Sequence, residues 1–223
     1  MIKELTWDSE FFNLKIGEWN LDEGDSQITN AFELVYVKSS SKKDLVIEGF
    51  KNSFGETKVV FAKQLQKQDI LSQNIRSIST NDDLNSLYNL AYESGKFSRF
   101  KLDEKFGDDN FKKLYRAWID NSLNRRFADE VIVFAENNTI TGFVTYKINN
   151  NFATVGLIAV NPQKQGLGIG KKLLDFVEQQ LINKGIFELR IPTQLENEGA
   201  CFFYKKQGYT ILETSHIMHY WKK

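Results

Sequence analysis

Hydrophobic and polar positions alternate in short runs along the first third of the chain. Residues 14–21, 34–38 and 58–65 have the alternation of strands, and Gly, Ser and Asp clusters separate them. The chain turns polar between residues 64 and 78. We therefore predict a small mixed α/β domain over residues 1–75 and a second domain over residues 76–223.

Helical spacing becomes clear in the second region. Apolar residues recur every three or four positions over residues 84–91, with Thr80 and Asn81 as candidate caps and Gly95 as the end. The same spacing returns over residues 111–118. These patterns predict two helices in succession.

Three strand-like runs follow the second helix, at residues 130–135, 140–148 and 152–160. Asn137-Asn138 and the asparagines at 149–151 are strong turn signals between them, so we predict an antiparallel meander. The elements predicted after it are a glycine-rich loop, a helix that buries positions 173–181 and ends at Gly185, a strand at 187–191, a helix at 197–206, and strands at 209–212 and 215–221. The fold class is therefore α/β.

Composition narrows the kind of protein. The 29 basic and 29 acidic residues cancel, which argues against nucleic acid as the main partner. The single cysteine, Cys201, cannot form an intramolecular disulfide, and this fits a reducing compartment. Charged residues near the N-terminus do not suit a signal peptide, and apolar runs such as 131–135 are far shorter than the ~20 residues of a membrane span. We expect a soluble cytoplasmic protein with no membrane contact.

The glycine-rich segment at residues 160–174 is the most informative part of the sequence. Gly166, Gly168 and Gly170 occupy alternate positions between a predicted strand and a predicted helix. Backbone N–H groups at a helix N-terminus favour phosphate. Two common phosphate loops do not fit, because a Walker loop needs Ser or Thr where Lys172 stands and a Rossmann fingerprint needs glycine at Lys171.

The spacing Gln165-x-x-Gly168-x-Gly170 after a strand resembles the acyl-CoA-binding loop of the Gcn5-related N-acetyltransferases (GNAT). The resemblance implies that the loop amides bind the pyrophosphate of coenzyme A and that the preceding strand pairs with its pantetheine arm. The residues that it assigns to the cofactor are Leu157, Ile158, Ala159, Val160, Gln165, Gly166, Leu167, Gly168, Ile169, Gly170, Lys171 and Asn197. A glycine-rich turn without a ligand is the alternative.

A second match lies near the C-terminus. Asn197, Ala200 and Tyr204, followed by Gly208-Tyr209, have the spacing of the family's last cofactor-binding helix. The resemblance implies that Tyr204 is the catalytic acid that protonates the departing thiolate. The alternative is that Tyr204 is a packing aromatic residue.

Four segments carry a closer resemblance, at residues 5–17, 98–106, 115–123 and 189–197. They are similar to dTDP-fucosamine acetyltransferases and related N-acyltransferases of dTDP-linked amino-dideoxy sugars. This resemblance implies a GNAT fold with a smaller mixed α/β N-terminal domain that contributes to nucleotide-sugar binding. It also implies acetyl-CoA or another acyl-CoA as donor, including a larger one such as 3-hydroxybutyryl-CoA, and a role in surface polysaccharide (lipopolysaccharide or O-antigen) synthesis.

A dTDP-sugar offers a flat base, a diphosphate and a sugar, so its site needs aromatic faces, cations and polar groups. The candidate substrate-binding residues are Trp7, Asp8, Ser9 and Phe11 on one side and Ser98, Arg99 and Asp103 on the other. The alternative for the aromatic residues is that they pack the two domains together.

No ionisable side chain lies on the strand before the glycine loop, which reads TVGLIAV. The acceptor amine must therefore lose its proton to ordered water or to another group. The candidates are Asp103, Asp129, Glu130, His216 and His219. We expect no metal site, because His216 and His219 are three apart in a predicted strand and point to opposite faces.

The sequence thus predicts acyl transfer from acyl-CoA to the amine of a dTDP-linked amino sugar by direct attack, with N–H groups over residues 157–159 as the oxyanion site. The alternatives are an acetyltransferase for a protein N-terminus, an aminoglycoside or a polyamine, and a module that senses acyl-CoA without turnover. We expect small-molecule partners, and a homodimer is an open alternative to a monomer.

Overall fold

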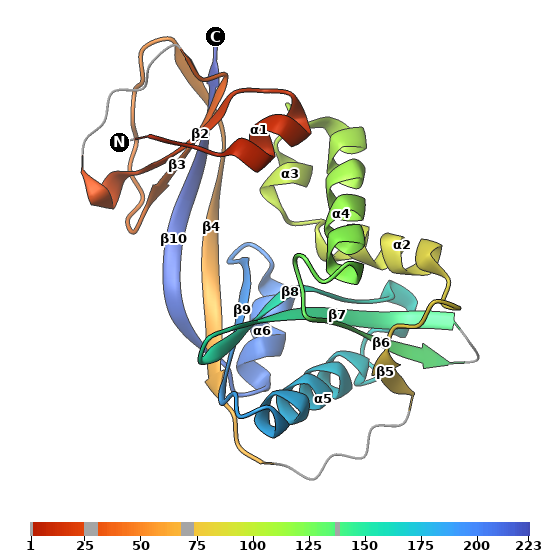
Figure 1. Ribbon diagram of the computed structural model, residues 1–223. Helices are drawn as coiled ribbons and strands as arrows, with labels where there is room; N and C mark the ends of the chain where they lie inside the picture. The colour runs from red at the N-terminus through yellow and green to blue at the C-terminus, as the bar shows by residue number, and fades with distance from the viewer. Residues whose placement is uncertain (1, 25–30, 68–73, 137–138) are drawn as a thin grey trace.

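The computed structural model describes residues 2–24, 31–67, 74–136 and 139–223, which form one ten-stranded mixed sheet with helices on its faces (Figure 1). The strands are β1 (Lys3–Glu4), β2 (Ile16–Asn20), β3 (Leu34–Ser39), β4 (Phe50–Gln64), β5 (Ile75–Ser77), β6 (Glu130–Glu136), β7 (Thr139–Asn149), β8 (Phe152–Val160), β9 (Glu188–Gln194) and β10 (Thr210–Lys222). The helices are α1 (Thr6–Phe12), α2 (Leu84–Ser94), α3 (Arg99–Leu102), α4 (Gly107–Leu123), α5 (Ile169–Asn183) and α6 (Glu198–Lys206), with 3₁₀ turns η1 (Leu21–Glu23) and η2 (Pro162–Lys164). The α/β class predicted from the sequence is confirmed.

The order of strands in the sheet is β1-β2-β3-β10-β4-β9-β8-β7-β6-β5. The long strand β4 comes from the first third of the chain, yet it lies between β9 and β10 and pairs antiparallel with both. The sheet is therefore continuous across residue 75. The division of binding roles between residues 1–75 and 76–223 stays a prediction.

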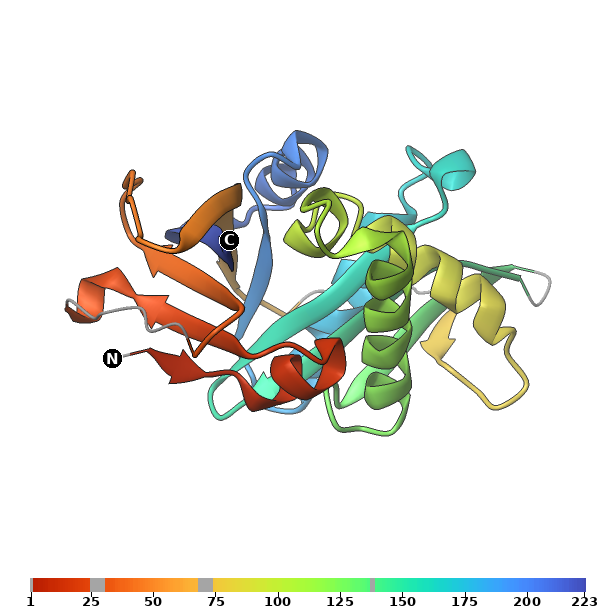
Figure 2. The same ribbon diagram turned by 90° about the horizontal axis from the view of Figure 1, so that it is seen from above.

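Two helical layers cover opposite faces of the meander. Figure 1 shows α2, α3 and α4 on one side of β6–β8 and α5 on the other, and Figure 2 shows α1 beside α4. Strand β6 serves both layers because its residues alternate: Val131 and Val133 pack with the α2–α4 cluster, and Ile132 and Phe134 pack with the α5–α6 cluster. A third apolar cluster, which includes Trp19 and Tyr220, covers the N-terminal strands.

Local chemistry explains most element ends and corrects several expected ones. Helix α2 begins at Leu84 because Asp83, and neither Thr80 nor Asn81, accepts the free N–H groups of its first turn. The strands expected at 209–212 and 215–221 are one strand, β10, with a register shift between Ile211 and Glu213. Strand β4 begins eight residues before the expected 58, and the expected turn at Asn137-Asn138 lies outside the described residues.

Strands β8 and β9 start as a parallel pair and then separate. They pair only at Ala153 with Leu189 and at Thr154 with Arg190. In the β4–β9 ladder the Leu195 N–H donates to the Thr57 carbonyl. Because backbone groups alternate along a strand, the backbone nitrogen of Pro192 points to the other side, toward β8. Proline has no N–H to donate, so Pro192 removes a bond that would hold the strands together. The strand expected to stop at 191 thus continues past a proline that helps to open the sheet.

Candidate active site

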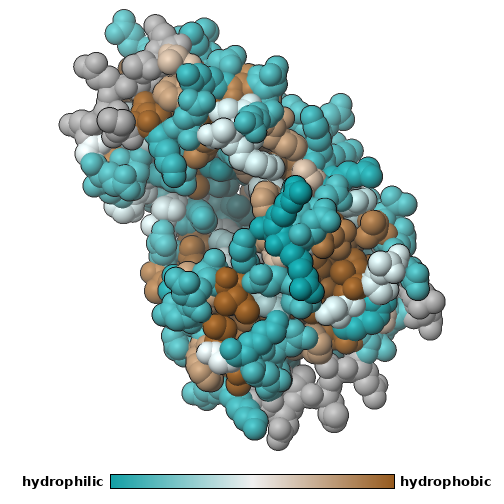
Figure 3. Space-filling model, viewed as in Figure 1, coloured by the Kyte–Doolittle hydropathy of each residue, from teal (hydrophilic) through white to brown (hydrophobic). Residues whose placement is uncertain are grey.

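A cavity of about 900 Å³ begins where β8 and β9 separate. Its walls come from β8, the glycine loop, α5 and α6 on one side, and from β3, β4, β10, α3 and α4 on the other. Figure 3 shows the surface hollowed between these two parts of the molecule. The cavity thus joins the glycine-rich segment to residues of the N-terminal strands.

The glycine loop lines one end of the cavity. Gly166 and Gly168 have positive φ angles of 79° and 78°, which L-residues rarely adopt, and Gly168 caps the N-terminus of α5. A Cβ atom at either position would meet open space, so the backbone is uncovered there. The first N–H groups of α5 lie at this end of the cavity. Free N–H groups at a helix N-terminus stabilise an anion, so an anionic group would be favoured here.

The open edge of β8 supplies unused backbone donors. The N–H of Asn161 donates to Thr141 of β7, and that of Leu157 donates to the Thr145 hydroxyl at 2.9 Å. Because peptide groups alternate along a strand, the N–H groups of Ile158 and Val160 point the other way, toward the separated β9. Among the residues expected to polarise a thioester carbonyl, Ile158 therefore has the available N–H, and Leu157 does not.

Three of the residues expected to bind the cofactor have local roles in this structure. Leu167 is 63% exposed and does not line the cavity. The Lys171 ammonium lies 2.6 Å from Asp175, one turn along α5. Asn197 is the N-cap of α6, where its side-chain oxygen accepts from the Ala200 N–H. Lys171 and Asn197 nevertheless line the cavity, and so do the remaining expected residues, Leu157, Ile158, Ala159, Val160, Gln165, Gly166, Gly168, Ile169 and Gly170.

Tyr204 on α6 also lines the cavity. Its ring packs against Phe61, Phe203 and Tyr209, and the residue is only 4% exposed. Burial raises the pKa of the Tyr204 hydroxyl well above its ordinary value of 10. The hydroxyl is therefore protonated at neutral pH and has a proton to give. Its catalytic role stays a prediction.

Arg99 lies on the opposite wall of the cavity. Its guanidinium carbon lies 4.2 Å from the centre of the Tyr36 ring and 4.8 Å from that of Phe100, and stacking of this kind holds the group in place. The buried Nη1 atom of Arg99 has no hydrogen-bond partner among the described residues. Ser98, which precedes it, lines the cavity too. A buried donor without a partner is costly, so Arg99 is suited to receive an anionic ligand.

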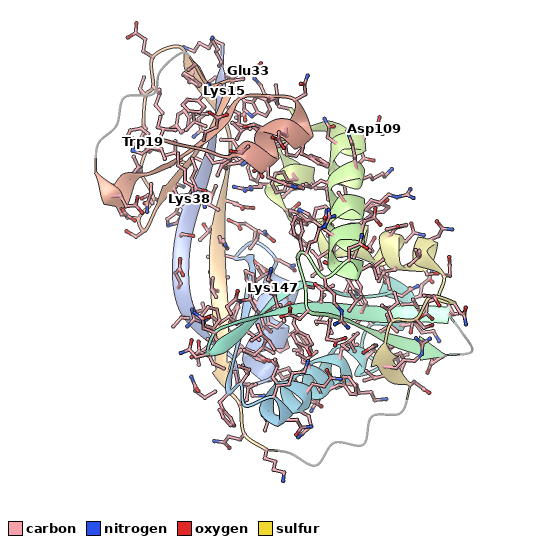
Figure 4. The ribbon with its side chains drawn as sticks, viewed as in Figure 1. Lys15, Trp19, Glu33, Lys38, Asp109 and Lys147 are labelled. Carbon is pink, nitrogen blue, oxygen red and sulfur yellow. The ribbon has the colours of Figure 1, made fainter. Side chains whose placement is uncertain are left out.

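Two lysines and a glutamate share this wall, and the sequence analysis did not single them out. Lys58 and Glu56 lie two apart on β4 and so face the same way, while Lys38 on β3, labelled in Figure 4, pairs with Ile217 of β10. Burial, with Lys38 and Arg99 nearby, lowers the pKa of Lys58, so the local potential is positive. No hydrophobic alternation marked these residues, because residues 56–61 read ETKVVF, and the expected strand start at 58 left Glu56 outside the strand.

The α1 residues lie beside this wall and do not line the cavity. The Ser9 hydroxyl accepts from the Ile16 N–H at 3.0 Å and so ties α1 to β2. Trp7 stacks on Phe11, with ring centres 5.0 Å apart. Burial raises the pKa of Asp8, and the charge of Arg99 opposes that rise. Their roles in substrate binding stay predictions.

Asp103 is the centre of a buried network outside the cavity lining. Its carboxylate accepts from His219 Nδ1 at 2.7 Å, from Trp221 Nε1 at 3.0 Å and from the Ser53 hydroxyl. Burial opposes ionisation of Asp103, but the hydrogen bonds from His219 and Trp221 leave its pKa below the ordinary value. Burial lowers the pKa of His219 to about 4, so its ring is neutral at pH 7. This network fits a structural role better than direct contact with a substrate.

The side chains expected as proton acceptors do not line the cavity, and they are Asp103, Asp129, Glu130, His216 and His219. Asp129 accepts the Ile148 N–H at 2.7 Å, and His216 contacts the Thr57 hydroxyl. Within the described ranges, no group of three or more His, Cys, Asp or Glu side chains is arranged to hold a metal ion. In the same part of the chain, no helix is long and apolar enough to cross a membrane.

Comparison with known proteins gives three informative matches. The model of the acetyltransferase (GNAT) family matches residues 83–209. The spore coat polysaccharide biosynthesis protein SpsD of Bacillus subtilis is 25% identical over 139 residues, which are 62% of this chain and 48% of that protein, so the chain spans about half the length of that relative. The spermidine N(1)-acetyltransferase of Thermoplasma acidophilum is 28% identical over 149 residues, which are 65% of this chain and 92% of that enzyme.

A solved structure also resembles the chain. The PaiA N-acetyltransferase of Thermoplasma acidophilum, in complex with coenzyme A, has a TM-score of 0.52 and 26% identity. The match covers 67% of this chain and 98% of that one. The segment matched by the family model contains the meander, the glycine loop and α6, and stops just before β10.

Proposed function

The chain belongs to the acetyltransferase (GNAT) family, and on that premise we propose that it transfers an acyl group from acyl-CoA to the amine of a dTDP-linked amino-dideoxy sugar. Acyl transfer to an amine is the chemistry of the family, and acyl-CoA is the donor. The proposal concerns the acceptor. It extends to a role in surface polysaccharide synthesis, for which the name of the Bacillus subtilis relative is a second support.

The observation that carries the proposal is the charge of the cavity wall. Among the residues that the structure describes, seven basic ones line the cavity, against two acidic ones, Glu56 and Glu93. The basic residues are Lys38, Lys58, Lys96, Arg99, Lys164, Lys171 and Lys206. Three of these, Lys38, Lys58 and Arg99, surround the end away from the glycine loop. A diphosphate carries two negative charges, so this end attracts a nucleotide sugar.

The same charge argues against a polyamine, although the Thermoplasma relative is named for spermidine. A polyamine needs an acidic cleft, because each of its ammonium groups would be repelled by the cations near Arg99. A protein N-terminus without negative charge leaves the buried Nη1 atom of Arg99 without a partner. An anionic acceptor satisfies both the charge and the free donor.

The chain's own residues have defined tasks under this proposal. The Gly166–Gly168 turn and the first N–H groups of α5 bind the donor's phosphates, and the Ile158 N–H polarises the thioester carbonyl. Tyr204 holds the proton that the departing sulfur receives. Arg99 and Lys58 hold the acceptor's diphosphate so that its amine reaches the carbonyl carbon.

The test is steady-state release of CoA thiol from acetyl-CoA by the full chain. A dTDP-linked amino-dideoxy sugar should give a rate far above hydrolysis, and spermidine or an aminoglycoside should not. Arg99→Gln should raise the KM for the nucleotide sugar at least tenfold, about 1.4 kcal/mol, and leave the KM for acetyl-CoA within twofold. Arg116→Gln is the matched control, because Arg116 also stacks on a tyrosine but lies outside the cavity.

Turnover of spermidine and none of the nucleotide sugar would overturn the proposed acceptor. Binding of acetyl-CoA with no turnover of any amine would favour an acyl-CoA sensor instead.

A further inference from the structure

We propose that Glu56 is the group that accepts the proton lost by the acceptor amine. The inference deepens the proposed function and rests on its amine-acceptor chemistry. Glu56 belongs to β4, a strand from the N-terminal third of the chain, and lines the same cavity as Tyr204 and the open edge of β8. A proton acceptor on this wall would face the amine from the side opposite the glycine loop.

Comparing the carboxylates that could accept this proton leaves Glu56. Of the two that line the cavity, Glu93 is 42% exposed in its side chain and lies 3.7 Å from the Lys96 ammonium. Glu56 is only 8% exposed. The acidic and histidine side chains considered from the sequence lie outside the cavity lining, as described above. Glu56 is therefore the buried carboxylate that can reach a bound amine.

The environment of Glu56 leaves one of its oxygens unused. The Oε2 atom is buried and has no hydrogen-bond partner among the described residues. A carboxylate oxygen accepts hydrogen bonds readily, and leaving it bare in a buried position is costly. An ammonium or amine at the cavity would satisfy it. In β4, Glu56 lies opposite Ile217 of β10, so pairing with that strand fixes its backbone.

Electrostatics gives this carboxyl group the properties of a base. Burial raises the pKa of Glu56 above its ordinary value of 4.5, and the charge of Arg99 limits the rise. Other groups that face it are Lys58 on its own strand and Glu196 beyond β9, with Tyr115 on α4. A carboxylate whose pKa is raised is a stronger base and takes a proton more readily.

The step balances with the groups present. The amine nitrogen attacks the thioester carbon, so an N–C bond forms and the C–S bond breaks. The surplus proton on nitrogen passes to the Glu56 carboxylate, directly or through one water, and Tyr204 gives a proton to sulfur. Glu56 and Tyr204 then return to their starting states when one proton passes between them through solvent.

The test is the Glu56→Gln variant of the full chain, assayed with a dTDP-linked amino-dideoxy sugar and saturating acetyl-CoA. We expect kcat to fall by roughly 10²-fold, the usual worth of a positioned base, and the acidic limb of the kcat profile against pH to disappear. CoA affinity by calorimetry should stay within twofold. Glu56→Asp should recover part of the rate and the acidic limb, which a purely structural role would not produce.

The matched control is Glu213→Gln, because Glu213 is exposed on the neighbouring strand β10 and does not line the cavity. It should leave kcat and its pH profile unchanged. A folded Glu56→Gln variant with the wild-type kcat and acidic limb would overturn the proposal.

Failure of the proposed acceptor is distinguishable from failure of Glu56. If the wild-type chain acetylates spermidine and not the nucleotide sugar, the same variants are assayed with spermidine. A second measurement needs no acceptor: carbon-13 NMR titration of glutamate-labelled protein, in which the Glu56 resonance is identified by its loss in Glu56→Gln. We expect it to titrate above 4.5, and titration at or below that value would overturn the proposal.

Discussion

The two walls of the cavity are built in opposite ways. The wall that we propose binds the acyl donor, called the donor wall, comes from one nearly continuous stretch, from β8 through the glycine loop into α5, with α6 added. The wall that we propose binds the acceptor, called the acceptor wall, takes Lys38 from β3, Glu56 and Lys58 from β4, and Arg99 from α3. Local spacing specifies the donor wall, whereas sheet order brings the acceptor wall together. A family can therefore keep the first as a motif while the second varies with the acceptor.

The walls also differ in what holds their polar groups. On the donor wall they are largely backbone N–H groups, placed by the positive φ of Gly166 and Gly168 and by the β8–β9 split. On the acceptor wall they are side chains with unsatisfied atoms, at Arg99 Nη1 and Glu56 Oε2. Backbone donors suit a ligand part common to every acyl-CoA. Side chains suit a ligand that differs between enzymes.

The largest expected effect tests whether Tyr204 on the donor wall acts as a catalytic acid or only as a packing residue. Tyr204→Phe should lower turnover by roughly 10²-fold with CoA affinity unchanged, because it removes the proton given to sulfur. The deficit should shrink as pH rises, because the CoA thiol has a pKa near 8.5 and its thiolate can leave at high pH without receiving a proton. The measurement is the wild-type to variant ratio of kcat across pH.

Tyr146→Phe is the control for that ratio. It removes a buried tyrosine hydroxyl, bonded to Gln180, that lies outside the cavity. Its turnover should equal the wild-type value. A Tyr204→Phe ratio near one at every pH would make Tyr204 a packing residue.

The next effect tests the backbone part of the donor wall. Gly168→Val should weaken CoA binding at least tenfold, about 1.4 kcal/mol, because valine rarely adopts a φ of 78° and its side chain covers the loop. Calorimetry measures the affinity. Gly107→Val imposes similar strain, at a φ of 74° outside the cavity, and should leave CoA affinity unchanged. Equal losses in both variants would mean that backbone strain, and not loop contact, causes the effect.

A smaller effect tests the charge of the acceptor wall. Lys58→Met should raise the KM for a dTDP-amino sugar by about fivefold, roughly 1 kcal/mol, and leave the KM for acetyl-CoA unchanged. Lys51→Met changes an exposed lysine of the same strand outside the cavity and should change neither constant. A parallel rise in both KM values for Lys58→Met would place Lys58 with the donor.

An effect of similar size, on stability and not on activity, concerns the buried network behind the acceptor wall. His219 has a pKa of about 4 when folded and 6.5 in its ordinary state, so the unfolded chain binds more protons between these values. Stability should therefore fall as pH falls through this window, by roughly 1 kcal/mol between pH 6.5 and 5.5. Urea unfolding measures it. His219→Asn should remove most of that slope, and an undiminished slope would contradict the assignment.

Several elements of this molecule could be predicted from local sequence patterns. The meander, the glycine loop and the helices around 173–181 and 197–206 were predicted because their spacing and turn residues act over a few positions. The residues that line the donor wall follow from the same stretch. The expected oxyanion donors needed refinement, since only the structure shows that Thr145 occupies the Leu157 N–H.

The sequence by itself determined the α/β class and the glycine-rich loop that resembles the family's acyl-CoA-binding loop, because both depend on short-range periodicity and on the backbone freedom of glycine. Only the tertiary structure decided that β4 inserts between β9 and β10, and that Glu56 and Lys58 thereby join Arg99 on one wall of the cavity. The physical reason is that strand pairing is a long-range contact. Residues 58 and 194 lie opposite each other in the β4–β9 ladder, and no local pattern encodes that pairing.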